Sequence, residues 1–153
     1  MFELNDKFYL GAVSGIIANI ISNVFGWSLY LLDINKFTMW HISGSAFFPK
    51  KSFERITPLF IGAVGDYTMA ALLGLFIVYL LYFTGLEHPF FKGLVATMFF
   101  WLTFYGMIVG TGITKINATT VGTNVTHFIN HLILGIITPL IITRYGKQLL
   151  TPQ

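Results

Sequence analysis

Long apolar runs alternate with shorter polar connections along the whole chain. The runs extend over Leu10 to Leu32, Thr57 to Leu86, Phe90 to Thr114 and Val125 to Thr143. A helix rises about 1.5 Å per residue, so about 20 apolar residues cross the roughly 30 Å hydrocarbon core of a bilayer. The pattern predicts an all-α integral membrane protein, with a four-helix transmembrane bundle as a single domain over residues 1–153.

Four spans place both ends of the chain on one side of the membrane, called side A here, with side B opposite. Lysine and arginine residues divide almost evenly between the two sides, so the positive-inside rule leaves the orientation open. The connection over residues 33–56, on side B, carries Trp40, Phe47 and Phe48 among polar residues. It is too short and too interrupted to span, which predicts an interfacial or re-entrant segment.

Small and polar residues recur at every fourth position in the first two spans. They are Gly11, Gly15, Asn19 and Asn23 in the first span, and Gly62, Asp66, Ala70 and Gly74 in the second. Residues four apart share one face of a helix, and small residues let transmembrane helices approach closely. We therefore expect these two faces to turn inward as helix interfaces.

Depth in the membrane brings polar residues of several spans together. Asn23, Asp66 and Tyr105 each lie about nine residues from the side-B end of their span, which is roughly 13 Å deep. His127 and His131 lie about 3 to 9 Å below the same surface. The sequence therefore predicts one polar site in the side-B half. Its residues are Asp66, His127, His131, Asn130, Asn19, Asn23 and Tyr105.

Asp66 allows two interpretations. A carboxylate inside a span costs about 2.5–3.5 kcal/mol to insert, so it should face protein or water and have a partner. In the first interpretation Asp66 only fastens helices, through hydrogen bonds to Asn19 or Asn23. In the second, it handles a proton or an ion.

His127 and His131 stand four residues apart, so both imidazoles can reach one ion from the same helix face. Asp66 and His41 would complete a set of nitrogen and oxygen ligands for a divalent metal, provided that the connection carrying His41 folds inward. The alternative is a pair of hydrogen-bonded histidines. Haem b is disfavoured, because ligation by two histidines needs imidazoles on opposite faces of the haem, and both intramembrane histidines lie on one span.

Composition narrows the class of protein further. Hydrophobic residues make up 55% of the chain and charged residues 10%, against about 25% charged residues in soluble domains. The net charge of +3 forms no basic stripe, so no nucleic-acid partner is expected. The absence of cysteine excludes disulfides and thiolate metal sites. No phosphate loop, dinucleotide fingerprint or nucleophile–base pair supports a particular enzymatic reaction.

Several short motifs from Lys92 onward carry a family resemblance. They are Lys92-Gly93, Trp101-Leu102-Thr103-Phe104, Thr119-Thr120, Thr123 and Gly135. This part of the chain resembles the uncharacterised YqhR-type four-span membrane proteins of spore-forming Firmicutes, but departs from them at His127 and His131. The resemblance implies a bacterial cytoplasmic membrane, and it transfers neither an activity nor a site.

The sequence thus predicts a small membrane protein whose polar site binds or conducts a cation, a proton or a small polar solute. The alternative is a non-catalytic accessory or scaffold subunit whose polar residues only hold helices together. A membrane enzyme or a b-type cytochrome is the third reading. The expected partner is the lipid bilayer, and a second copy of the chain or another membrane protein is left open.

Overall fold

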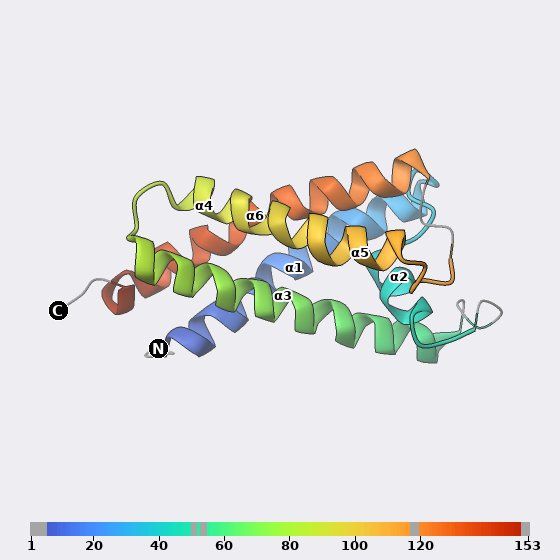
Figure 1. Ribbon diagram of the computed structural model, residues 1–153, viewed down its shortest axis with the longest axis horizontal. Helices are drawn as coiled ribbons and strands as arrows, with labels where there is room; N and C mark the ends of the chain where they lie inside the picture. Colours follow the sequence, from blue (N-terminus) through green and yellow to red (C-terminus); the bar gives the residue numbers. More distant parts are fainter. Residues whose placement is uncertain (1–5, 50–51, 53–54, 117–119, 151–153) are drawn as a thin grey trace.

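The computed structural model describes residues 6–49, 52, 55–116 and 120–150, which fold into helices joined by turns (Figure 1). The elements are α1 (Lys7–Leu31), α2 (Met39–Ser45), α3 (Ile56–Thr84), α4 (Pro89–Phe100), a π-helical turn η2 (Trp101–Tyr105), α5 (Gly106–Gly110) and α6 (Val121–Leu150). Because α4, η2 and α5 follow one another directly, they make one long span, Pro89–Gly110.

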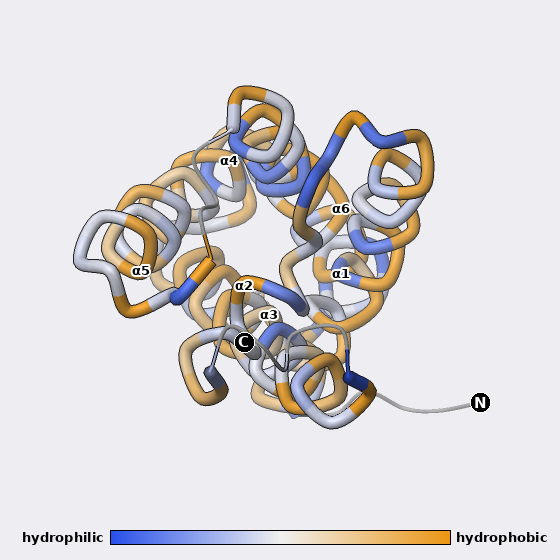
Figure 2. Tube along the Cα trace, turned by 90° about the vertical axis from the view of Figure 1, so that its right-hand side faces the viewer, coloured by the Kyte–Doolittle hydropathy of each residue, from blue (hydrophilic) through white to orange (hydrophobic). Residues whose placement is uncertain are grey.

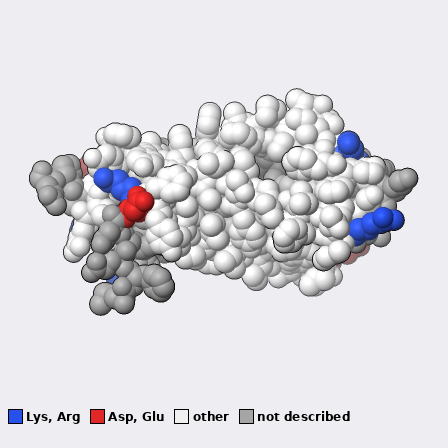
Figure 3. Space-filling model, turned by 90° about the horizontal axis from the view of Figure 1, so that it is seen from below, with Lys and Arg blue, Asp and Glu red and all other residues white. Residues whose placement is uncertain are grey.

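Four helices of the described chain are long and apolar enough to cross a membrane: α1, α3, Pro89–Gly110 and α6. In Figure 3, the charged side chains on the visible face lie at the two ends of the bundle, with an uncharged surface between them. The predicted four-helix bundle is confirmed. Its bounds differ from the apolar runs: α6 continues past Thr143 to Leu150, since a helix can extend beyond the hydrocarbon layer.

The faces of small residues on α1 and α3 pack against each other, and the helices run antiparallel. A Cβ atom at Gly15 would overlap the carbonyl oxygen of Ala70, and one at Gly74 would overlap the carbonyl oxygen of Gly11. The two backbones therefore touch where glycine removes the side chain, as in other small-residue crossings in membranes. The predicted use of these faces as a helix interface is confirmed.

The third span and α6 form a second antiparallel pair. A Cβ atom at Gly93 would overlap the carbonyl oxygen of Gly135, and one at Gly135 would crowd the hydroxyl of Thr97. Pro139 lies inside α6, and its ring packs close to Gly93. Proline cannot donate a hydrogen bond to the carbonyl one turn earlier, which is that of Gly135. The close approach of α4 therefore covers the backbone group that Pro139 leaves unpaired within the helix.

Helix α1 joins the two pairs, because it also packs along α6. Leu10 lies against Gly146 near side A. Farther along, the hydroxyl of Ser22 donates to the carbonyl oxygen of Asn130 at 3.4 Å. An apolar core that includes Leu10, Leu73 and Ile142 fills the space between the helices.

The segment between the first two spans folds inward as α2. This short helix runs antiparallel to the start of α3: Gly44 lies against Pro58, and Gly62 against Trp40. Ile42 is completely buried. Figure 2 looks onto this end of the bundle, where α2 lies beside α3 and inside the ring of longer helices. Residues 39–45 are therefore packed within the bundle, in keeping with the re-entrant form of the prediction.

Candidate functional site

Asp66 lies on α3 directly opposite the two asparagines of α1. The side-chain amide of Asn19 donates to Oδ2 of Asp66 at 2.8 Å, and that of Asn23 donates to the same oxygen at 2.7 Å. Only 8% of Asp66 is exposed. Asn19 and Asn23 lie on the same face of α1 as its small residues. The close packing of α1 on α3 therefore also brings both amide donors to one oxygen. Oδ2 is thus fixed as an acceptor.

Across the bundle, α6 presents His127, Asn130 and His131. Nε2 of His127 lies 3.1 Å from the carbonyl oxygen of Phe37, and Nδ1 of His131 lies 2.8 Å from the carbonyl oxygen of His127. A carbonyl only accepts, so each of these ring nitrogens is the donor. The second nitrogen of each neutral ring, Nδ1 of His127 and Nε2 of His131, is then an acceptor.

Tyr105 packs beside this face from the π-helical turn η2. Its ring centroid lies 5.1 Å from that of His127, and its hydroxyl donates to Oδ1 of Asn124 at 2.8 Å. A π-helical turn adds a residue to one helical turn and often occurs at functional sites. Here it brings the ring of Tyr105 toward α6, and the hydroxyl is used to tie the third span to the start of α6.

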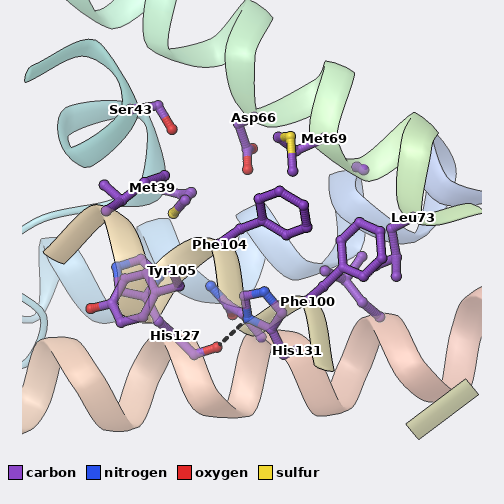
Figure 4. Close-up of a pocket in the computed structure, with 14 residues that line it drawn as sticks. Met39, Ser43, Asp66, Met69, Leu73, Phe100, Phe104, Tyr105, His127 and His131 are labelled. Carbon is purple, nitrogen blue, oxygen red and sulfur yellow. Dashed lines mark hydrogen bonds between the residues drawn. The ribbon is translucent and has the colours of Figure 1, made fainter. Parts of the chain in front are cut away.

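A cavity of about 120 Å³ separates the carboxyl of Asp66 from the imidazoles (Figure 4). Figure 4 shows Asp66 and Met69 on α3 facing Tyr105, His127 and His131, with Phe100 and Phe104 extending into the same space. The remaining lining residues are Met39, Ser43, Ala70, Leu73, Ile108, Asn130 and Leu134. Asp66, Tyr105, His127, Asn130 and His131 therefore share one cavity. Asn19 and Asn23 support Asp66 from α1.

The cavity is mainly apolar, and its polar groups are concentrated on two opposite walls. Among its described lining residues, none is a lysine or arginine. Asn130 is 7% exposed, and its Oδ1 atom has no hydrogen-bond partner among the described residues. An unpaired polar atom in an apolar interior is costly, so native proteins seldom keep one without a role. The site combines a carboxyl group, acceptor nitrogens and an unpaired amide oxygen around a small apolar space.

His41 occupies a different position from the other predicted site residues. It is buried among the rings of Trp27, Tyr30 and Phe37, and its Nδ1 atom lies 2.8 Å from the hydroxyl of Thr38. The backbone N–H of Thr38 also donates to this nitrogen, which closes the first turn of α2. His41 therefore serves as a capping residue of α2. It is not among the α2 residues that line the cavity, which are Met39 and Ser43.

The predicted metal set of Asp66, His127, His131 and His41 is not brought together. Across residues 6–49, 52, 55–116 and 120–150, no three His, Cys, Asp or Glu side chains are close enough to hold one ion. The physical reason is position, because Asp66 and the two histidines lie on opposite walls of the cavity and His41 is not among the residues that line it. The amides of α1 hold Asp66, backbone carbonyls hold His127 and His131, and Thr38 holds His41.

The sequence did not indicate several residues that shape the site. Met39 and Ser43 reach the cavity only because α2 folds inward, and Met69, Phe100 and Phe104 form its apolar walls. Met69 lies three residues after Asp66, which puts both residues on the same helix face. This spacing could have predicted that Met69 lies beside the site. The π-helical turn that positions Phe104 and Tyr105 leaves no mark in the hydrophobic pattern.

No protein-family model matches the chain, and comparisons with curated proteins and with solved structures give no match. The geometry shows a membrane helical bundle with buried polar residues, among them Asn19, Asn23 and Asp66.

Proposed function

We propose that this chain is a small binding or transport protein of a membrane, and that the cavity between Asp66 and the histidines takes up a proton or a small polar solute. The observation that carries this proposal is the position of a buried carboxyl group and two imidazoles on opposite walls of one cavity. Ionisable groups inside a membrane are costly and usually mark pathways for protons, ions or substrates.

The hydrogen bonds of Asp66 suit such a role. Both α1 amides bind Oδ2, and the indole of Trp40 lies near the same carboxyl group. The second carboxyl oxygen, Oδ1, is therefore the one that we expect to exchange a proton or bind a solute. His127 and His131 stand across the cavity, and each ring keeps one acceptor nitrogen. A proton or a donor group entering the space therefore meets acceptors on both walls, without any rearrangement of the hydrogen bonds that hold the helices.

The metal form of this function is not supported, because the four expected ligands do not converge. A divalent ion prefers several oxygen or nitrogen ligands around it, whereas this cavity is lined mainly by apolar side chains. A proton, or a solute that has an apolar part, suits these walls better.

Accessibility of the cavity gives a direct test, and the natural chain contains no cysteine to interfere. Ala70→Cys puts a thiol on the cavity wall, and Ala96→Cys puts one at an equally buried position away from the cavity. A small water-soluble thiosulfonate reagent should label the Ala70→Cys protein and leave the Ala96→Cys protein unlabelled. Equal protection of both thiols would contradict an accessible site.

Proton movement is tested in sealed vesicles that contain the purified protein and an internal pH-sensitive dye. An imposed pH gradient should relax faster with the wild-type chain than with Asp66→Asn, which keeps the shape and the acceptor for α1 but loses the exchangeable proton. Asp33→Asn is the matched control, because Asp33 is an exposed carboxylate at the side-B end. This function would be contradicted if the pH gradient relaxed equally fast with wild type and with Asp66→Asn, and if no added small polar solute changed either rate.

An accessory or scaffold subunit is the second candidate, and one observation favours it. Asp66 is bound by two side chains of the neighbouring helix, as expected for a residue that only fastens helices. Under this function, cavity labelling and proton movement would both be absent. We also propose that the chain is related to the YqhR-type proteins and lies in a bacterial cytoplasmic membrane, and neither relation assigns a site.

A further inference from the structure

We propose that the cavity binds a small primary amine in its ammonium form, with a compact apolar body, and that this ligand enters from the bilayer between α3 and the η2–α5 part of the third span. This inference rests on the proposed function and names the chemical class of the solute. It follows from the hydrogen-bonding groups of the cavity, its charge, its apolar walls and the position of its opening.

Asp66, His127 and His131 offer acceptors to the cavity, beside the hydroxyl of Ser43 and the amide of Asn130, which can also donate. The N–H groups of His127 and His131 are used by backbone carbonyls, which leaves an acceptor nitrogen on each ring. Oδ2 of Asp66 is occupied by α1, and Oδ1 is its second acceptor. The complementary ligand must therefore bring donors. An ammonium group supplies three N–H donors and no acceptor.

Charge leads to the same class of ligand. Asp66 is the carboxyl group in the cavity wall, and no lysine or arginine is found among the described residues around it. A buried carboxylate needs a counter-charge, or it must take a proton. A ligand ammonium at Oδ1 would supply that charge. The pair would then also lie near the electron-rich faces of Phe100, Phe104 and Tyr105, which attract cations.

The remaining walls set the size and polarity of the ligand body. Met39, Met69, Leu73, Ile108 and Leu134 are apolar, so a second charged group would be poorly solvated there. An apolar cavity of about 150 Å³ is known to hold benzene. This space of about 120 Å³ is somewhat smaller, so it suits an amine whose apolar body is no larger than one six-membered ring.

Phe104 is the most exposed of the residues that line the cavity, at 38%, so we place the opening beside it. Helix α3 packs closely against α1 and α2, whereas no close packing of α3 against η2 or α5 is found among the described residues. The rings of Trp101 and Tyr105 on η2 contact α6 instead. In Figure 2, α5 and α3 stand apart at this end of the bundle. An amphipathic amine collects at the membrane surface, so an opening toward lipid would receive it from a concentrated source.

The test uses benzylamine as the probe and benzyl alcohol as its uncharged counterpart of similar shape. Both are titrated into the full chain in detergent micelles near neutral pH, and binding is followed by calorimetry. We expect saturable binding of benzylamine, with affinity lower by about ten-fold or more for benzyl alcohol and for Asp66→Asn. Asp33→Asn should bind benzylamine as the wild type does. Equal affinity of Asp66→Asn and wild type, or of the two probes, would overturn the inference.

A second measurement separates this inference from the proposed function. Benzylamine should slow the labelling of Ala70→Cys by the thiosulfonate reagent, whereas benzyl alcohol should not. If Ala70→Cys is labelled and Asp66 moves protons, but benzylamine neither binds nor protects, the amine ligand is wrong and the proposed function stands. If Ala70→Cys resists labelling and no proton movement depends on Asp66, both fail together.

Discussion

Asn23 of α1 donates a 2.7 Å hydrogen bond to Oδ2 of Asp66 on α3, the same oxygen that receives the amide of Asn19. The contact belongs to a regular register between two antiparallel helices, in which Gly11 meets Gly74 and Gly15 meets Ala70. Along the same contact between α1 and α3, the backbones pack closely toward side A, and the side chains form hydrogen bonds toward side B. The helix interface and the candidate site are parts of one crossing.

Two substitutions of Asp66 distinguish the role of its hydrogen-bond acceptor from the role of its charge. Asp66→Asn keeps an oxygen that can accept from both α1 amides, so its thermal stability in detergent should stay close to that of the wild type. Asp66→Leu leaves two buried amides unpaired and should lower the free energy of unfolding by about 1–3 kcal/mol. A double-mutant cycle with Asn23→Ala should give a coupling of about 0.6–1.7 kcal/mol, the range measured inside membranes. A coupling of zero would mean that the bond has no energetic role.

Gly15 should tolerate no side chain, because any Cβ there would overlap the carbonyl oxygen of Ala70. Gly15→Val forces α1 and α3 apart, and we expect the free energy of unfolding to fall by about 1–3 kcal/mol or more. Gly110→Val is the control, since no atom from another part of the described chain lies within 4 Å of a Cβ built at Gly110. Thermal unfolding of the two purified variants in the same detergent makes the comparison, and similar losses would contradict the close crossing.

His127 and His131 should differ in what their loss does to the fold. His127 donates across the bundle to the carbonyl oxygen of Phe37, whereas His131 donates to a carbonyl of its own helix. His127→Ala should therefore loosen the connection before α2 and speed tryptic cleavage after Lys36 by several-fold, while His131→Ala should not. Cleavage rates in detergent-solubilised protein measure this. Equal rates in both variants would show that the bond from His127 does not hold the connection.

Single cysteines at the two ends of the bundle test the arrangement across the membrane. Asp33 and Glu87 are both exposed, and they lie at opposite ends of the long helices. In sealed vesicles of uniform orientation, a membrane-impermeant thiol reagent should reach Asp33→Cys from one side and Glu87→Cys from the other. Labelling of both from the same side would be incompatible with four spans.

The spans and their inward faces could be predicted because lipid enforces simple rules. Every segment that crosses the bilayer must satisfy its own backbone hydrogen bonds, which favours helices. Polar side chains must avoid the hydrocarbon, and small residues mark where helices approach closely. Spacing by four residues was enough to place Asn19, Asn23 and Asp66 on facing surfaces. Depth along each span was enough to place Asp66, Tyr105 and His131 in one region of the bundle.

Other features depend on contacts that leave no local pattern. The inward fold of α2 requires Gly44 and Gly62 to meet across elements that are separate in sequence. The π-helical turn changes which side chains of the third span face inward. The expected metal ligands also do not converge, because Asp66 and the histidines lie on opposite walls of the cavity and His41 does not line it. Residue spacing along the chain does not give that separation.

The division into two antiparallel pairs, α1 with α3 and α4 with α6, has a consequence for biosynthesis. Each pair is made of spans that leave the ribosome one after the other, so each can close as a hairpin before the other is complete. The turn between them, near Gly85, is held by Lys92, whose ammonium group donates to the carbonyl oxygens of Thr84 and Gly85. A gene divided at this turn should therefore yield two fragments that insert separately and reassemble in the membrane along the surface of α1 that faces α6.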